Sequence, residues 1–216
     1  MSYYGVKING VDTLETYGLI LGADLSIADA APREMRVEIP GMDGTLDCSR
    51  ALTGAPTYGD REISFNLIKN VSDAELSKLR AILAAQCGYE IKLVLPDDAE
   101  HYWRGVLALG KADGYNSGTI PLSFTAYPYK LKHEKTTVTM ELTAEDTEIT
   151  LGNEMMRTVP TFTATAETTL TVGDSTYTIA AGQNYTNTVI VLSAGTNTLK
   201  AKGGGTLTVT YQEGTL

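Results

Sequence analysis

The stretch that decides the fold is residues 61–96, which read REISFNLIKNVSDAELSKLRAILAAQCGYEIKLVLP. Apolar residues occupy alternate positions in residues 62–68, and a second alternating run follows at Ile91, Leu93 and Leu95. Strict alternation is typical of a strand with one buried face, so each run predicts a strand. The segment between the two strands has a different period.

That middle segment predicts an amphipathic helix. Ser72-Asp73-Ala74-Glu75 is a capping box, in which the Ser72 hydroxyl accepts from the Glu75 backbone N–H and the Glu75 carboxylate reaches back. Gly88 is expected to end the helix, because glycine accepts the left-handed conformation without strain. The apolar residues recur at three- and four-residue spacing, at Leu76, Leu79, Leu83 and Cys87. The order strand, helix, strand predicts one helix lying on an antiparallel sheet or sandwich.

The flanking sequence extends this first half to residue 130. Two more strands are predicted at residues 103–109 and 118–126. Residues 40–44, PGMDG, carry two turn signals, and residues 46–59 show no sustained period. A segment of this kind usually has a function or packs on a neighbouring chain, with a solvated surface loop as the plain alternative. Residues 1–130 are therefore expected to form a β-sandwich or barrel-like domain plus the helix.

The second half, residues 131–216, predicts a β-sandwich. Threonine occupies more than a quarter of its positions, as suits strands with one face in water. Residues 168–179 predict a hairpin whose turn is Gly173-Asp174, with glycine where a type II′ turn needs it. A further strand is predicted at residues 189–192. Seven or eight such short strands indicate a sandwich.

The composition narrows the class of protein. The 216 residues are 43% apolar, which excludes global disorder, and their net charge of −9 argues against a groove for nucleic acid. No apolar run is long enough to cross a bilayer, and residues 1–5, MSYYG, lack the pattern of a secretory signal. The two cysteines, Cys48 and Cys87, cannot build a disulfide framework or a four-ligand zinc site. We therefore expect no membrane contact and two reduced cysteines.

Few residues could carry catalysis. The histidines, His101 and His133, have no partner at metal-ligand spacing, and neither cysteine has the sequence signature of a nucleophile. We expect no catalytic residue, no metal, no cofactor and no enzymatic activity. Tyr185 lies in a polar segment and is the candidate for stacking on a sugar, whereas Tyr177 and Tyr211 fall in phase with core positions.

Five segments carry a resemblance to a known family. In the first half they are IPGMDGTLD at residues 39–47, YGDREISF at 58–65 and, after the capped helix, FTAYPY at 124–129. In the second half they are GTNTL at residues 195–199 and GTLTVTY at 205–211. In this order they resemble the distal tail protein (Dit) family of siphophages, whose members form the tail-tip or baseplate hub and end in a galectin-like β-sandwich.

The resemblance implies a structural protein of a phage or prophage. Six copies would form a ring, with residues 1–130 around a channel and residues 131–216 pointing outward. The implied partners are other copies of the chain, the tail tube protein, and a tail-associated lysin, fibre or receptor-binding protein. DNA would pass through the lumen without specific binding, and the acidic composition would keep it from adhering to the wall. The chain would be made in the bacterial host cytoplasm and would act at the virion tail tip.

The aperiodic segment is the expected contact between neighbouring copies. A head-to-tail contact closes into a ring when its rotation divides a full turn. Leu46, Leu52 and Tyr58 are expected to contribute to this contact. The alternative is a cell-surface carbohydrate-binding β-sandwich protein without catalysis, for which a host-encoded version would need an export signal.

Overall fold

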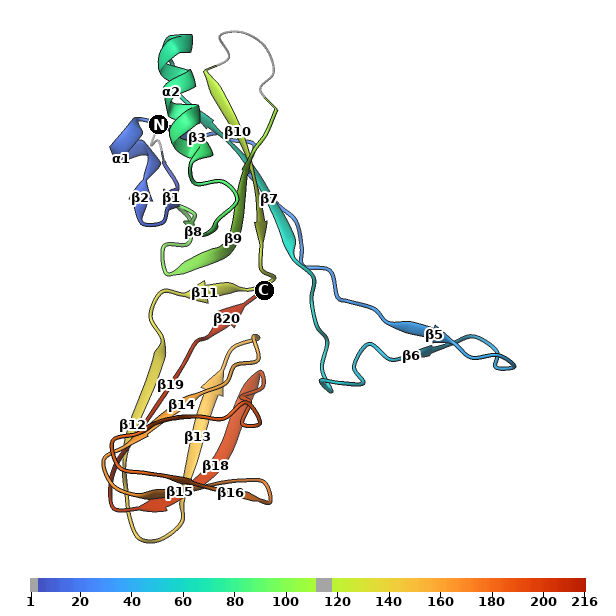
Figure 1. Ribbon diagram of the computed structural model, residues 1–216, viewed down its shortest axis with the longest axis vertical. Coiled ribbons are helices and arrows are strands. Elements are labelled where there is room, and N and C mark those ends of the chain that lie inside the picture. Colours follow the sequence, from blue (N-terminus) through green and yellow to red (C-terminus); the bar gives the residue numbers. More distant parts are fainter. Residues whose placement is uncertain (1–3, 112–117) are drawn as a thin grey trace. The chain divides into compact units, whose positions relative to one another are not determined.

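The computed structural model describes residues 4–111 and 118–216, and the protein is mainly β, as the sequence predicts (Figure 1). The chain divides into two compact units, Met1–Lys130 and Leu131–Leu216. Each unit has a hydrophobic core of its own. Strand β11 (Lys130–Lys132), at the division, pairs with β20 (Gly214–Thr215).

The first unit is built on one antiparallel sheet. Its path runs β2-β1-β8-β9-β10-β7-β3, and β4 also pairs with β7. In the register of β7 with β10, Ile63 lies opposite Phe124 and Phe65 lies opposite Leu122, so these buried side chains share one face. The strands are β1 (Lys7–Ile8), β2 (Val11–Asp12), β3 (Ile20–Leu21), β4 (Ser26–Ile27), β7 (Arg61–Ile68), β8 (Glu90–Val94), β9 (His101–Leu109) and β10 (Thr119–Ala126).

The predicted helix is α2 (Asp73–Ala84), and one arm of its capping box forms as expected. The Ser72 hydroxyl accepts from the Glu75 N–H at 3.4 Å, but the Glu75 carboxylate binds Lys69 Nζ at 3.1 Å. The prediction that Gly88 ends the helix is wrong by one turn. Gly88, with φ of 81°, instead closes the turn that follows the helix and leads into β8.

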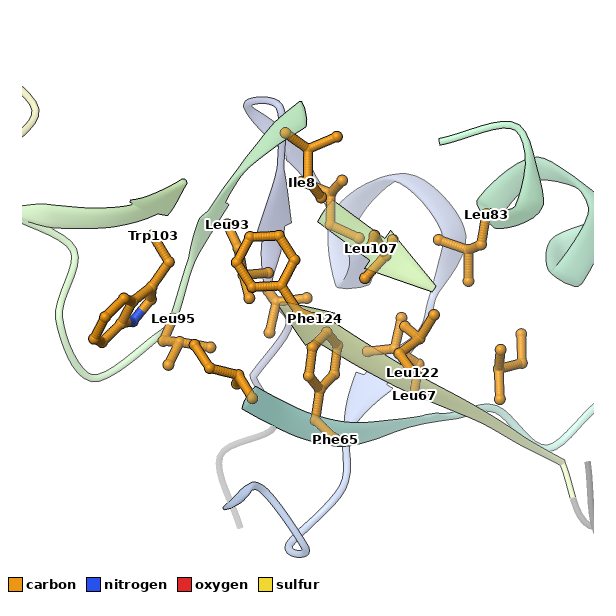
Figure 2. Packing of buried hydrophobic residues seen from close by; sticks show 14 of the residues in the cluster. Ile8, Phe65, Leu67, Leu83, Leu93, Leu95, Trp103, Leu107, Leu122 and Phe124 are labelled. Atoms are coloured by element: carbon orange, nitrogen blue, oxygen red, sulfur yellow. The ribbon is translucent and has the colours of Figure 1, made fainter. Parts of the chain in front are cut away.

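Helix α2 contributes its apolar stripe to the core of the first unit. Leu79 and Leu83 are buried there with side chains of the sheet. Figure 2 shows Leu83 reaching from the helix toward Leu107, with Phe124 and Trp103 further along the same cluster. The spacing read from the sequence therefore predicts the buried face correctly.

A second helix, α1 (Thr13–Tyr17), corrects the expectation of a single helix. The Asp12 carboxylate caps its N-terminus by accepting from Leu14 N and Glu15 N. Gly18, with φ of 67°, provides a left-handed C-cap. At five residues, α1 is too short to show an apolar stripe, so only its caps could have signalled it.

The segment expected to be aperiodic contains a strand. β5 (Arg36–Glu38) and β6 (Thr45–Asp47) form a two-stranded antiparallel sheet and lie side by side in Figure 1. Leu46, at the start of the predicted loop of residues 46–59, lies opposite Val37 in this ladder. The rest of that segment consists of turns and irregular backbone up to β7.

The second unit is a sandwich of two four-stranded antiparallel sheets, as predicted. Their orders are β12-β19-β14-β17 and β13-β18-β15-β16, and both sheets supply residues to one core. The predicted hairpin is β15–β16; of its two turn residues, only Gly173 has a positive φ, at 58°, which suits a type II′ turn. The strands are β12 (Thr136–Leu142), β13 (Thr147–Asn153), β14 (Thr161–Ala164), β15 (Thr168–Val172), β16 (Ser175–Ile179), β17 (Asn184–Thr186), β18 (Gly195–Gly203) and β19 (Gly205–Tyr211).

The prediction of a strand at residues 189–192 is wrong. A turn occupies its start, because Ile190 N donates to the carbonyl of Asn187 and Val189 N donates to the Asn187 side chain. Ile190 and Leu192 are buried, whereas Val189 is 74% exposed. The core-facing residues of this apolar run are therefore Ile190 and Leu192, and Val189 points away from the core. The short strand β17 lies just before this turn.

Candidate functional site

The candidate functional site is an arm, residues 28–60, which leaves the sheet of the first unit after β4 and returns to it at β7. Its two limbs are joined by backbone hydrogen bonds close to the sheet. Gly59 N donates to Ala31 O at 2.8 Å, and Arg33 N donates to Thr57 O at 2.7 Å. Further out, β5 pairs with β6. The arm is therefore a continuous hairpin.

The arm has almost no core of its own. Every residue from 31 to 47 is exposed, and none from 23 to 60 is buried. Ordering the backbone of one residue costs about 1–2 kcal/mol, and this arm recovers little of that cost by burial. Its large apolar side chains are 38% to 100% exposed, and they are Met35, Val37, Ile39, Met42, Leu46 and Leu52. Exposed apolar side chains that gather in one segment are typical of interaction sites.

The arm also contains a hollow of about 490 Å³, here called the arm hollow. Its shape is fixed by bonds between the limbs, because Met35 N donates to Ser49 Oγ and Cys48 N donates to Met35 O, both at 2.8 Å. The hollow is lined by Arg33, Glu34, Met35, Cys48, Ser49, Ala51, Leu52, Thr53 and Thr57. It combines apolar, sulfur-containing and hydroxyl side chains with one basic and one acidic residue, Arg33 and Glu34.

Charged groups lie on and beside the paired strands β5 and β6. The hydrogen bonds that Asp47 accepts from Ser49 lower the pKa of the Asp47 carboxyl below its ordinary value, so this group stays ionised near neutral pH. Arg36 Nε lies 3.2 Å from Glu34 Oε2, and both side chains are more than half exposed. An exposed pair of this kind contributes little to stability, so these charges are available to orient a partner.

The three residues predicted for the contact between copies lie on this arm. Leu46 is 46% exposed in β6, and Leu52 is fully exposed at the hollow. Tyr58 differs from them, because it is half-buried near the sheet and its ring meets the Tyr129 ring edge to face, with centroids 6.0 Å apart. The structure thus leaves Leu46 and Leu52 exposed on the arm and places Tyr58 at the base of the arm. Their role in a contact stays a prediction.

Sequence reasoning missed the other half of this surface. Met35, Val37 and Ile39 alternate with charged residues, which is the pattern of a strand with one buried face. In the structure all three side chains are exposed. Alternation shows which residues share a face, but it does not show whether that face is buried within the chain or exposed.

The described residues offer no arrangement for metal chemistry: within 4–111 and 118–216, no three His, Cys, Asp or Glu side chains cluster to hold an ion. His101 Nδ1 lies 2.7 Å from one oxygen of Asp98, and the other oxygen binds Lys130 Nζ. Burial alone would raise the pKa of Asp98, but the hydrogen bonds from Lys130 and His101 hold it below its ordinary value. Cys48 and Cys87 are free thiols.

No helix in the described part of the chain has both the length and the apolar character needed to span a bilayer.

Tyr185, the candidate for a sugar contact, lies in β17 opposite Phe162 and is half-buried against the core. Its hydroxyl accepts from Asn187 Nδ2 at 3.1 Å, and its ring lies 6.4 Å from the Tyr177 ring. The expected exposure of Tyr185 is therefore only partial, while Tyr177 and Tyr211 contact the core as predicted. Carbohydrate binding stays a prediction.

The outer face of the sheet β12-β19-β14-β17 is a lattice of threonines. Thr137, Thr210, Thr161 and Thr186 lie in register across all four strands. Thr161 and Thr186 hydroxyl oxygens are 3.0 Å apart, and those of Thr137 and Thr210 are 3.5 Å apart. This face is polar; it also carries Glu141, which accepts from the Thr206 hydroxyl at 2.7 Å.

Comparison with known proteins is informative at the level of the structure. No family profile and no curated protein matches the chain. Among solved structures it is similar to SPP1 Dit, which is described as a paradigm of the hub adsorption apparatus in phages that infect Gram-positive bacteria. The TM-score is 0.69, the sequence identity is 15%, and the match covers 100% of both chains. The chain therefore has the Dit fold over its whole length.

Proposed function

We propose that this protein is a structural component of a phage or prophage tail tip, a ring-shaped hub that joins the tail tube to the fibre or receptor-binding apparatus. The observation that carries the proposal is the match to SPP1 Dit over the full length of both chains. A match to one domain would fit many functions, since a β-sandwich is a common scaffold. A match to both units in the same order is far more restrictive.

In this proposal the two units have different tasks. Residues 1–130 form the ring, and residues 131–216 form a galectin-like sandwich at its periphery. The exposed apolar arm supports the first assignment, because a closed ring needs a head-to-tail contact between two different surfaces of neighbouring copies. A stable contact buries on the order of 1,600 Å² in total. The protein acts through geometry and catalyses no reaction.

The acidic composition fits a channel for DNA. With a net charge of −9 per chain, a ring has an excess of carboxylates that repel phosphates within about one Debye length, ~8 Å at physiological salt. A calculated potential that is strongly positive along the wall of the assembled ring would contradict this part of the proposal.

Native mass spectrometry of the purified protein tests the ring. Six copies of the 23.2 kDa chain predict a species of about 140 kDa, and electron microscopy should show it as a closed ring. The double variant Leu46→Asp/Leu52→Asp should abolish this species, because each substitution places a charge in the proposed contact. Tyr58→Asp is tested separately, since Tyr58 also contacts Tyr129.

Val189→Asp is the matched control. Val189 also has an apolar side chain that is exposed to solvent, at 74%, but it lies in the second unit. This variant should assemble like the unaltered protein. A protein that stays a single chain at high concentration and on tail-tube templates, and that turns over a substrate, would overturn the proposed function.

A further inference from the structure

The tip of the arm contains an aspartate–glycine pair, Asp43-Gly44, directly before β6 begins at Thr45. In such a pair the backbone nitrogen of the glycine can attack the side-chain carboxyl carbon of the aspartate, because glycine has no side chain to obstruct the approach. The product is a cyclic imide, a succinimide. The reaction takes place within one chain, so its rate depends on how freely the two residues move in the fold.

The fold leaves Asp43 and Gly44 unrestrained. In the part of the chain that the structure describes, the Asp43 carboxylate accepts no hydrogen bond and the Gly44 N–H donates none; the bond across the tip runs from Met42 N to Ile39 O. Both residues are exposed. Apart from the two chain neighbours of Gly44, no heavy atom lies within 4 Å of the position that a Cβ on this glycine would occupy. The ring can therefore close without breaking a tertiary contact.

A similar pair elsewhere in the first unit is restrained. Asn9-Gly10 joins β1 to β2. Asn9 Oδ1 accepts from Lys92 N at 3.0 Å, and Asn9 Nδ2 donates to Gln86 Oε1 at 3.3 Å. In a flexible peptide an asparagine–glycine pair closes faster than an aspartate–glycine pair, because an amide carbon is a better electrophile than the carbon of an ionised carboxylate. Here the side-chain bonds of Asn9 must break before its Cγ can approach Gly10 N.

We infer that Asp43 is a site of spontaneous isomerisation to isoaspartate, and that the fold reverses the usual order of reactivity between the two pairs. Gly44 N forms a bond to Asp43 Cγ while a Cγ–O bond breaks, and the hydroxyl leaves as water with the amide proton. Water then adds to one carbonyl of the succinimide. Addition at Cγ restores aspartate, and addition at the main-chain carbonyl gives isoaspartate. The inference goes beyond the proposed function, since every step occurs within one chain.

The isomerisation changes the tip and spares the strands. In isoaspartate the main chain runs through Cβ and Cγ, so the backbone gains one methylene and the carboxylate is attached to Cα. The extra methylene falls in the loop between Glu38 and Thr45, which form the last pair of the β5–β6 ladder. A modified chain therefore keeps this ladder and has a longer tip.

Peptide mapping of the folded protein tests the site. The purified protein is incubated at neutral pH, then denatured and digested with endoproteinase Asp-N, which cleaves before aspartate but not before isoaspartate. The fraction left uncut at residue 43, with unchanged mass, should grow with the time of incubation. Over the same period the peptide that contains Asn9 should keep its amide.

Asp174 is the matched control for this digestion. It also lies exposed in a turn, but the next residue is Ser175, which carries a side chain and begins β16. Cleavage before Asp174 should stay complete or nearly so. An uncut fraction at residue 43 that does not exceed the fraction at Asp174 would overturn the assignment of the site.

The variant Asp43→Asn tests the effect of the fold on two chemically identical pairs. In the folded variant the amide at residue 43 should be lost at least about tenfold faster than the amide of Asn9, because only Asn9 must first break its bonds to Lys92 and Gln86. Mass spectrometry detects each loss as the replacement of an NH₂ group by OH. Equal rates in the folded variant would contradict the inferred protection of Asn9.

Unfolding the same variant in guanidinium chloride completes the test. Without the fold, the side-chain bonds of Asn9 are absent, so the rates at residue 43 and Asn9 should become similar. This convergence supports the inference. A tenfold difference that persists in the unfolded chain would show that the local sequence sets the order, and it would overturn the role assigned to the fold.

Discussion

Replacing Lys132 with methionine should destabilise the second unit at neutral pH and much less at acid pH. Lys132 Nζ lies 2.8 Å from Glu154 Oε1 and 2.7 Å from Glu213 Oε2. The hydrogen bonds that Lys132 donates, to Glu154 first and Glu213 second, raise the pKa of Lys132 to about 12. Glu213 is buried, which alone would raise its pKa, but the hydrogen bonds from Lys132 and Thr136 hold that pKa below its ordinary value. The buried Glu213 side chain is therefore stabilised in its ionised form only by the hydrogen bonds from Lys132 and Thr136.

The size of the expected loss in unfolding free energy depends on the burial of Glu213 and on the partial exposure of Lys132. A hydrogen bond to a charged group contributes about 1.5–3 kcal/mol. Because the side chain of Lys132 is 35% exposed, solvent screening places the loss at about 2 kcal/mol near neutral pH. Methionine keeps the apolar stem, so the loss comes from the charge.

The destabilisation caused by Lys132→Met should decrease as the pH falls. In the unaltered protein the contribution of Glu213 is complete above its ordinary pKa of 4.5 and is lost as the pH falls through its lowered folded-state pKa. Without Lys132, burial raises the pKa of Glu213, so the folded variant binds a proton more readily as the pH falls. The difference in unfolding free energy between the two proteins should therefore shrink from about 2 kcal/mol near pH 7 to below about 0.5 kcal/mol near pH 4.

Urea unfolding with two probes measures this difference. Far-UV circular dichroism reports both units, whereas the one tryptophan of the chain, Trp103, lies in the first unit. Its fluorescence midpoint should be the same in both proteins. The double variant Lys132→Met/Glu213→Gln is the matched control and should recover more than half of the loss near pH 7. A difference that stays constant or grows toward pH 4 would refute the reasoning.

Three further predictions concern the first unit, with the fluorescence of Trp103 as the probe. Phe124→Ala should lower the unfolding free energy by about 3–5 kcal/mol, since Phe124 is fully buried; a loss below about 1 kcal/mol would contradict this packing. Gly105→Ala should cost at least about 2 kcal/mol, because the added Cβ would lie 2.1 Å from the carbonyl oxygen of Thr125 in the paired strand, and an unchanged midpoint would exclude this close approach. Ser72→Ala should cost about 1 kcal/mol by removing the N-cap of α2, while Ser72→Asp should not; equal losses would argue against capping.

Periodic segments with one buried face could be predicted from the sequence. β7, α2 and the hairpin β15–β16 formed as expected, since each element buries its stripe within the same chain. The run at residues 189–192 failed because four consecutive apolar residues have no period, so the sequence could not indicate which of them face inward. Helix α1 was missed because its stability comes from its two caps and its tertiary contacts.

The candidate site was predictable only in part. Leu46 and Leu52 stood out as apolar residues in a segment without regular structure, and both are exposed on the arm. The hollow was not predictable, because it arises where two limbs distant in sequence are joined through Met35 and Cys48. An exposed apolar strand face has the same alternation as a buried one, so the sequence does not distinguish the two.

The way the arm meets the sheet has an evolutionary consequence. The chain leaves and re-enters through adjacent backbone positions, since Gly59 N bonds to Ala31 O and Ala28 N bonds to Glu62 O. Residues 32–58 can therefore be exchanged as a cassette, by recombination or by grafting, while the strands on either side keep their partners. Because the arm is the proposed contact between copies, chains with different cassettes would share one scaffold and would not be expected to assemble with one another.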